Sequence, residues 1–154
     1  MTRIWFFLHF FGFIIWLGGG WAAMVGGLTA RGAWRPALGT VARVQAAIQR
    51  TLIAPGAVLV VVSGLVLTMR FMGAMSTPMS PWLMAMQGVG LLGALVTLLV
   101  GLPTASRMAR VDPEGPHAAY FDELRGRYRI AGSVGGVLAL VALISAVIYR
   151  TGGA

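Results

Sequence analysis

Four long apolar segments constrain the fold of this chain more than any other feature of its sequence. An α-helix needs around 20 apolar residues to cross the hydrocarbon core of a bilayer, which is about 30 Å thick. The four segments run over residues 4–28, 51–69, 82–102 and 130–149. We therefore expect an all-α membrane protein, a bundle of four transmembrane helices. The connecting stretches are too short to bury a core of their own, so residues 1–154 should form a single integral membrane domain.

Basic residues gather in two of the three connections between these segments. The net charge of +8 comes from 12 Arg and no Lys. These residues lie mainly in the first and third connections, at Arg31, Arg35, Arg43, Arg50, Arg107, Arg110, Arg125, Arg127 and Arg129. The connection from Phe71 to Pro81 carries no charge. The positive-inside rule then predicts a cytoplasmic position for both basic connections and places both termini outside. The charge thus indicates topology, and we expect no nucleic-acid partner.

The residue types that are missing exclude several classes of function. Without Cys the chain has no disulfide, no thiolate metal site and no Cys nucleophile. No carboxylate lies in an apolar segment, which argues against a proton-relay transporter. No Walker loop, nucleophile elbow or zinc spacing is present either, so no catalytic residues are assigned. The use of Arg without Lys, with many Ala and Gly, is typical of a bacterial genome rich in G and C. The expected location is the bacterial inner membrane.

The segments are compatible with two tandem two-helix repeats. An offset of 77 residues superimposes Trp5 on Trp82 and Arg50 on Arg127. In this register His9 corresponds to Met86, and each follows its Trp by four positions, about one helical turn.

Each basic connection is expected to contain a helix that runs into the next span. In residues 40–50 the apolar stripe is Val41, Val44 and Ile48, at helical spacing. In the second connection Asp112-Pro113-Glu114 is read as a helix start, and the stripe is Tyr120, Phe121, Leu124 and Tyr128. Both helices lie on the inner membrane surface or extend the spans into the cytoplasm; the pattern leaves both arrangements open.

His9 is the strongest candidate for chemistry because ionisable side chains inside a span are uncommon and usually face the bundle interior. An unpartnered polar group in an apolar medium costs roughly 2–7 kcal/mol, so the imidazole should have a partner. His9 shares a helix face with Gly12 and Trp16, and Gly12 would clear space beside the ring. Neutral imidazole is a common ligand of metals, haem iron included. The alternatives are a structural bond to a carbonyl, a water or a headgroup.

Methionine supplies two further candidate sites. Met86, at the pseudo-equivalent position to His9, would complete a His–Met axial pair for haem b iron. Alternatively, the soft thioethers around the middle connection favour Cu(I). The residues of this copper alternative are Met69, Met72, Met75 and Met79.

Three sequence motifs resemble a group of small bacterial membrane proteins. They are LHFFGFIIWLGG in the first span, RTLIAPGAVLVVVSGLVL at the second and PWLMAMQGVGLLG at the third. Together they resemble proteins with the CopD-like copper-resistance domain and the HemJ-type protoporphyrinogen oxidases. The resemblance implies a four-helix bundle with a functional His in the first span, which maps onto His9. In the haem-associated HemJ-type enzymes a Lys follows the Trp of the third span by four residues. Here that residue is Met86, which argues against porphyrinogen oxidation and leaves haem binding open.

The leading hypothesis from the sequence is a b-type haem or related metal site near the outer surface, serving electron transfer or porphyrin handling. A non-catalytic accessory subunit, packed by its Gly-rich faces within a homo-oligomer or a larger membrane complex, is one alternative. Cu(I) handling through the Met-rich connection is the other.

Overall fold

The structure is a computed structural model, and it describes residues 2–72 and 80–152, with the side chains of Phe71 and Met72 left out. Its helical elements follow in chain order: α1 (Thr2–Thr29), η1 (Ala30–Gly32), α2 (Arg35–Ile48), η2 (Gln49–Ile53), α3 (Ala54–Met72), α4 (Pro81–Leu95), η3 (Val96–Gly101), α5 (Leu102–Met108), η4 (Gly115–His117) and α6 (Ala118–Arg150). Here η1 and η4 are 3₁₀ turns, whereas η2 and η3 are π-helical. The described part of the chain contains no strand, which confirms the all-α fold.

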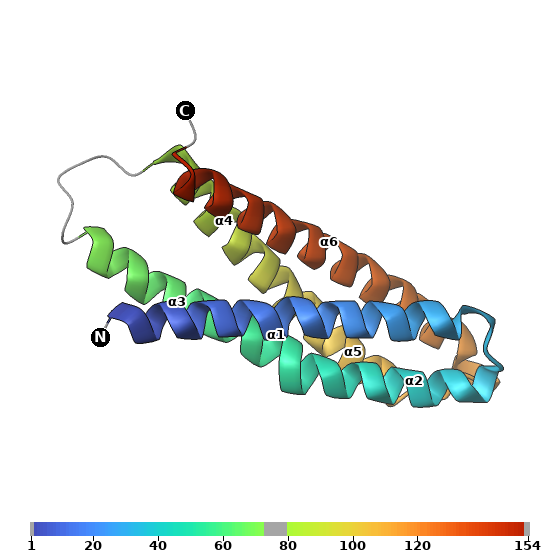
Figure 1. Ribbon diagram of the computed structural model, residues 1–154. Helices are drawn as coiled ribbons and strands as arrows, with labels where there is room; N and C mark the ends of the chain where they lie inside the picture. Colours follow the sequence, from blue (N-terminus) through green and yellow to red (C-terminus); the bar gives the residue numbers. More distant parts are fainter. Residues whose placement is uncertain (1, 73–79, 153–154) are drawn as a thin grey trace.

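Among the described residues, consecutive elements join into four long helices, which we call rods. Each is long and apolar enough to cross a membrane. They cover Thr2–Gly32, Arg35–Arg70, Pro81–Met108 and Gly115–Arg150. In Figure 1, α1 begins and α6 ends at the same end of the bundle, which we call the termini end. Residues 30–35 and 108–118 turn at the opposite end, which we call the linker end.

The rods extend beyond the apolar segments at the linker end. The second rod has 36 residues, or about 54 Å of helix, against about 30 Å of hydrocarbon. The helices expected in the two basic connections are therefore continuous with the spans that follow them. The fourth rod begins later than the sequence suggested, because Gly115 has a left-handed φ of 77° and precedes Pro116. Asp112 caps no helix, since its Oδ1 accepts the N–H of Glu114 within the turn.

The buried face of α2 differs from the predicted apolar stripe. Val44 is 53% exposed, whereas Gln45 and Gln49 are buried. Gln45 Nε2 donates to the carbonyl of Ala23 on α1 at 2.9 Å, so its amide is satisfied inside the bundle. On α6 the predicted stripe is largely confirmed, since Phe121, Leu124 and Tyr128 are buried and only Tyr120 is exposed.

The two π-helical segments are explained by prolines that follow them. Pro55 and Pro103 each lie two residues after a π segment. A proline has no N–H to donate, and its ring clashes with the carbonyl four residues earlier. A widened turn relieves this clash, as the N–H of Ala54 bonds to the carbonyl of Gln49, five residues back. The N–H of Leu102 bonds to the carbonyl of Thr97 in the same way.

Glycine allows the helices to pack as two close pairs, α1 with α3 and α4 with α6 (Figure 1). A Cβ placed on Gly56 would lie only 2.8 Å from the carbonyl oxygen of Gly12 and from the backbone nitrogen of Trp16. In the other pair, a Cβ on Gly135 would lie 3.0 Å from Thr97 Oγ1. Small residues let backbones approach where dispersion holds apolar helices together. The contacts of Gly12 and Gly56 thus indicate that these two glycines serve helix packing.

The two pairs join in the middle and at the linker end. Their ribbons diverge toward the termini end in Figure 1, where a hydrogen bond from Gln87 to Thr68 still connects them. In the middle, Gln49 Nε2 donates to the carbonyl of Thr97 at 3.2 Å, and Tyr128 Oη donates to Gln49 Oε1 at 3.2 Å. One amide therefore connects the second, third and fourth rods. At the linker end, an apolar cluster that includes Met108, Phe121 and Leu124 fills the space between the rods.

We predict that Gly56→Ala destabilises the protein, because the added methyl group meets the α1 backbone at 2.8 Å. Overpacking of this kind typically costs about 1–3 kcal/mol. Gly20→Ala is the matched control, since a Cβ there meets nothing within 4 Å. Thermal unfolding in detergent should show a lower midpoint for Gly56→Ala and an unchanged or slightly higher one for Gly20→Ala. Equal midpoints for the two variants would contradict the close α1–α3 packing.

Candidate cofactor site around His9

The imidazole of His9 lies against α3 in the half of the bundle nearer the termini. Its Nδ1 is 3.0 Å from the carbonyl oxygen of Val60 and 3.1 Å from Ser63 Oγ. A carbonyl oxygen can only accept a hydrogen bond, so Nδ1 must carry the proton. The ring packs over Gly64, where a Cβ would lie 3.1 Å from His9 Cε1. These contacts thus set the orientation of the ring and place a proton on Nδ1.

Ser63 serves as a hydrogen-bond acceptor for the imidazole. Its hydroxyl donates to the carbonyl of Leu59 within α3, so its lone pairs face His9 Nδ1–H. The residue is 0% exposed. A nucleophilic Ser activated by His needs an unprotonated imidazole nitrogen that accepts the hydroxyl proton. It also needs access for a substrate. Neither condition holds for this pair, which leaves Ser63 a positioning role.

The second ring nitrogen, Nε2, has no hydrogen-bond partner among residues 2–72 and 80–152. Every buried side-chain N or O atom in these ranges has a partner. Nε2 has none, so it is not buried. In a neutral imidazole with Nδ1 protonated, Nε2 presents a lone pair. Histidines that ligate metals usually donate their other N–H to a carbonyl or carboxylate, which fixes the ring and raises the basicity of the ligating nitrogen. His9 has this arrangement.

Two residues predicted to line a cofactor, Gly12 and Trp16, take part in helix packing, and their cofactor role stays a prediction. A Cβ on Gly12 would lie 3.1 Å from the carbonyl oxygen of Gly56, so this glycine sits against α3 and leaves no open space. Gly64 supplies the room beside the ring. Trp16 is 4% exposed and reaches between the helix pairs. A Cβ placed on Gly93 of α4 would lie 3.4 Å from its Cη2 atom.

His9 and Met86 belong to different helix pairs. The hydrogen bonds of His9 and its glycine neighbour are all on α3, whereas Met86 is half-buried on α4. The pairs diverge toward this end (Figure 1). The structure therefore brings His9 together with Ser63 and Gly64, and a His9–Met86 axial pair stays a prediction.

The residues of the copper alternative fall at the end of α3 and beyond it. Met69 is 63% exposed on α3, and Met72 is the last residue of that helix. Met75 and Met79 lie outside the described residues. In the described ranges, no group of three or more His, Asp or Glu side chains gathers to hold a metal ion.

A second polar contact, which the sequence reading missed, reinforces α3 near His9. Gln87 Nε2 on α4 donates to Thr68 Oγ1 at 2.7 Å, and Thr68 Oγ1 donates to the carbonyl of Gly64 at 2.9 Å. Gln87 thereby connects α4 to the same turn of α3 on which the imidazole packs. The sequence did contain one indication of these contacts, because Ser63 and Thr68 carry the hydroxyl groups in the otherwise apolar residues 52–69.

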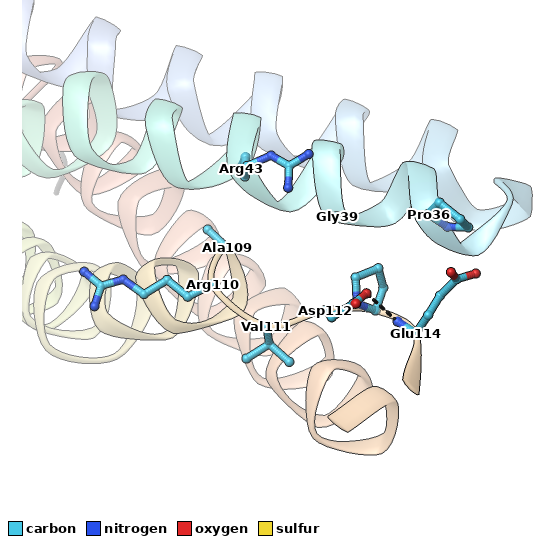
Figure 2. A pocket seen from close by; sticks show the side chains of 9 residues that line it. Pro36, Gly39, Arg43, Ala109, Arg110, Val111, Asp112 and Glu114 are labelled. Atoms are coloured by element: carbon cyan, nitrogen blue, oxygen red, sulfur yellow. Dashed lines mark hydrogen bonds between the residues drawn. The ribbon is translucent and has the colours of Figure 1, made fainter. Parts of the chain in front are cut away.

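The linker end has a hollow of about 370 Å³ between α2 and residues 109–114, shown in Figure 2. Its lining includes Arg43 and Arg110 together with Asp112 and Glu114. Two cations and two carboxylates give no net charge with which to select a ligand. His117 is exposed in η4, as expected for a solvated linker residue.

Comparisons of the chain with protein-family models, curated proteins and solved structures find no match. The resemblance to CopD-like and HemJ-type proteins therefore stays a prediction, and the interpretation of the site depends on its geometry.

Proposed function

We propose that this protein is a membrane haem protein in which His9 Nε2 ligates the iron, serving electron transfer or porphyrin handling. The observation that supports this most directly is the pair of acceptors on the other ring nitrogen. Val60 O and Ser63 Oγ, at 3.0 and 3.1 Å from Nδ1, hold the tautomer in which Nε2 has its lone pair available.

The set of donors around His9 favours haem over a bare metal ion. A site built from protein ligands alone generally needs three or four of them. His9 is the one strong metal ligand that the described contacts bring to this position. A porphyrin would itself supply four nitrogens to the iron, so one protein imidazole would suffice to hold it. When bound, haem supplies a one-electron couple.

The residues of the chain then have separate tasks at this site. The carbonyl of Val60 and the hydroxyl of Ser63 orient the imidazole and raise the basicity of Nε2. Gly64 leaves room for the ring. Apolar residues dominate the neighbouring turns and keep the surroundings dry, which is one of the factors that set the potential of a haem.

The orientation in the membrane is part of the same proposal. Nine of the Arg residues of the chain lie between the middle of the bundle and the linker end, at positions 31, 35, 43, 50, 107, 110, 125, 127 and 129. By the positive-inside rule this end faces the cytoplasm of a bacterium. His9 then lies in the outer half of the inner membrane, where an extracytoplasmic redox partner would have the shorter path to it.

The first prediction concerns the ligand itself. Protein purified from haem-sufficient membranes should show a Soret band, and His9→Ala should lose most of it because the imidazole that would hold the iron is removed. His117→Ala is the matched control, since the other His of the chain is exposed in the linker. Absorption spectra normalised to protein check this. A colourless wild-type protein, or equal haem content in both variants, would contradict the proposal.

A second prediction concerns the residue that positions His9. Ser63→Ala removes one acceptor of Nδ1–H and should weaken haem affinity about 10-fold or more, the usual effect of losing such a partner. Ser145→Ala is the control, because Ser145 is also buried and donates to a backbone carbonyl, but on α6. Haem titration of apoprotein measures both variants. Equal affinities would show that Ser63 has only a structural role.

A further inference from the structure

An apolar groove opens at the surface between α3 and the η3–α5 segment, away from His9. Its volume is about 530 Å³. Val58, Leu59 and Val62 of α3 line one wall, and Leu98 and Leu102 line the other. Val58 and Val62 are each about half-exposed, so the groove is open to the surroundings of the bundle.

The length and position of the groove match one leaflet of a bilayer. From Arg50 to Val62 the helix advances 12 residues, or about 18 Å. Half of a hydrocarbon core of about 30 Å is about 15 Å. Arg50 directly precedes the apolar segment 51–69, and Ser106 and Arg107 follow the apolar segment 82–102 on the opposite wall. The Arg50 end therefore lies at the boundary between apolar and polar residues.

Arg50 is held across this end of the groove. Its Nε donates to Ser106 Oγ on α5 at 3.3 Å, while the structure gives its two Nη atoms no partner among residues 2–72 and 80–152. No acidic residue lines the groove. The acidic side chains lie elsewhere, with Asp122 paired to Arg35 at 2.6 Å and Glu123 to Arg127 at 3.5 Å. No acidic side chain of the described residues pairs with Arg50, whose guanidinium is exposed.

We propose that the groove binds an anionic phospholipid, with one acyl chain along Val58 and Val62 and the phosphate on the guanidinium of Arg50. Guanidinium groups bind phosphate through paired N–H donors, and the two Nη atoms remain for this. The apolar walls exclude a polar ligand from the rest of the groove. This site does not rest on the haem proposal, since none of the residues that line the groove hydrogen-bonds to His9.

Native mass spectrometry of the detergent-solubilised protein, titrated with phosphatidylglycerol or phosphatidylcholine of identical acyl chains, tests the headgroup. A single Arg at the membrane surface should give about a fivefold preference for phosphatidylglycerol. Arg50→Gln should lose this preference. Arg43→Gln should keep it, since Arg43 is an exposed Arg of the same rod outside the groove. Equal preference in wild type and Arg50→Gln would overturn the proposal.

A second pair of variants tests the acyl chain. Val58→Trp and Val62→Trp fill the groove from a half-exposed position and should reduce retention of both lipids severalfold. Val137→Trp on α6 is the control for a bulky side chain at a similarly exposed site. Unchanged lipid retention in both groove variants would overturn the proposal. So would loss of a dimer mass without loss of lipid, because a second copy of the chain would then occupy the groove.

Discussion

A polar side chain inside an apolar bundle must find its hydrogen-bond partner within the protein, and the rest of this structure depends on how that requirement is met. His9, Gln45 and Gln49 each reach a backbone carbonyl of another helix, at Val60, Ala23 and Thr97. No buried side-chain N or O atom of the described residues is left without a partner. An unpaired group would cost roughly 2–7 kcal/mol, so these bonds fix the helices relative to one another.

The α1–α3 contact combines packing with the candidate chemistry. Gly12 and Gly56 bring the two backbones together, and one to two turns further along the same contact the imidazole of His9 packs on Gly64. The close approach at Gly56 thus sets the distance at which Nδ1 meets the Val60 carbonyl. Gly12 and Gly56 serve this packing, and Gly64 leaves room for the imidazole.

The sequence was sufficient to predict the four apolar rods and the all-α bundle, because span length and hydropathy depend on local composition. It also singled out His9, but it could not identify Ser63 and Gly64 as neighbours, since the register of α1 on α3 depends on tertiary contacts. Apolar periodicity placed Val44 on the apolar stripe of its helix, whereas the structure exposes Val44 and buries Gln45. Periodicity failed there because a buried amide is tolerated once it bonds to a carbonyl.

The tautomer of His9 is the most direct test of this account, because the ligand role of Nε2 requires the proton on Nδ1. The chain has two His residues, so His117→Ala leaves His9 as its single imidazole. Nitrogen-15 NMR of this variant as apoprotein in lipid nanodiscs distinguishes a protonated from an unprotonated ring nitrogen. We expect a neutral ring with a slowly exchanging proton on Nδ1 and an unprotonated Nε2. A proton on Nε2 with a bare Nδ1 would contradict the bond to Val60 and the site built on it.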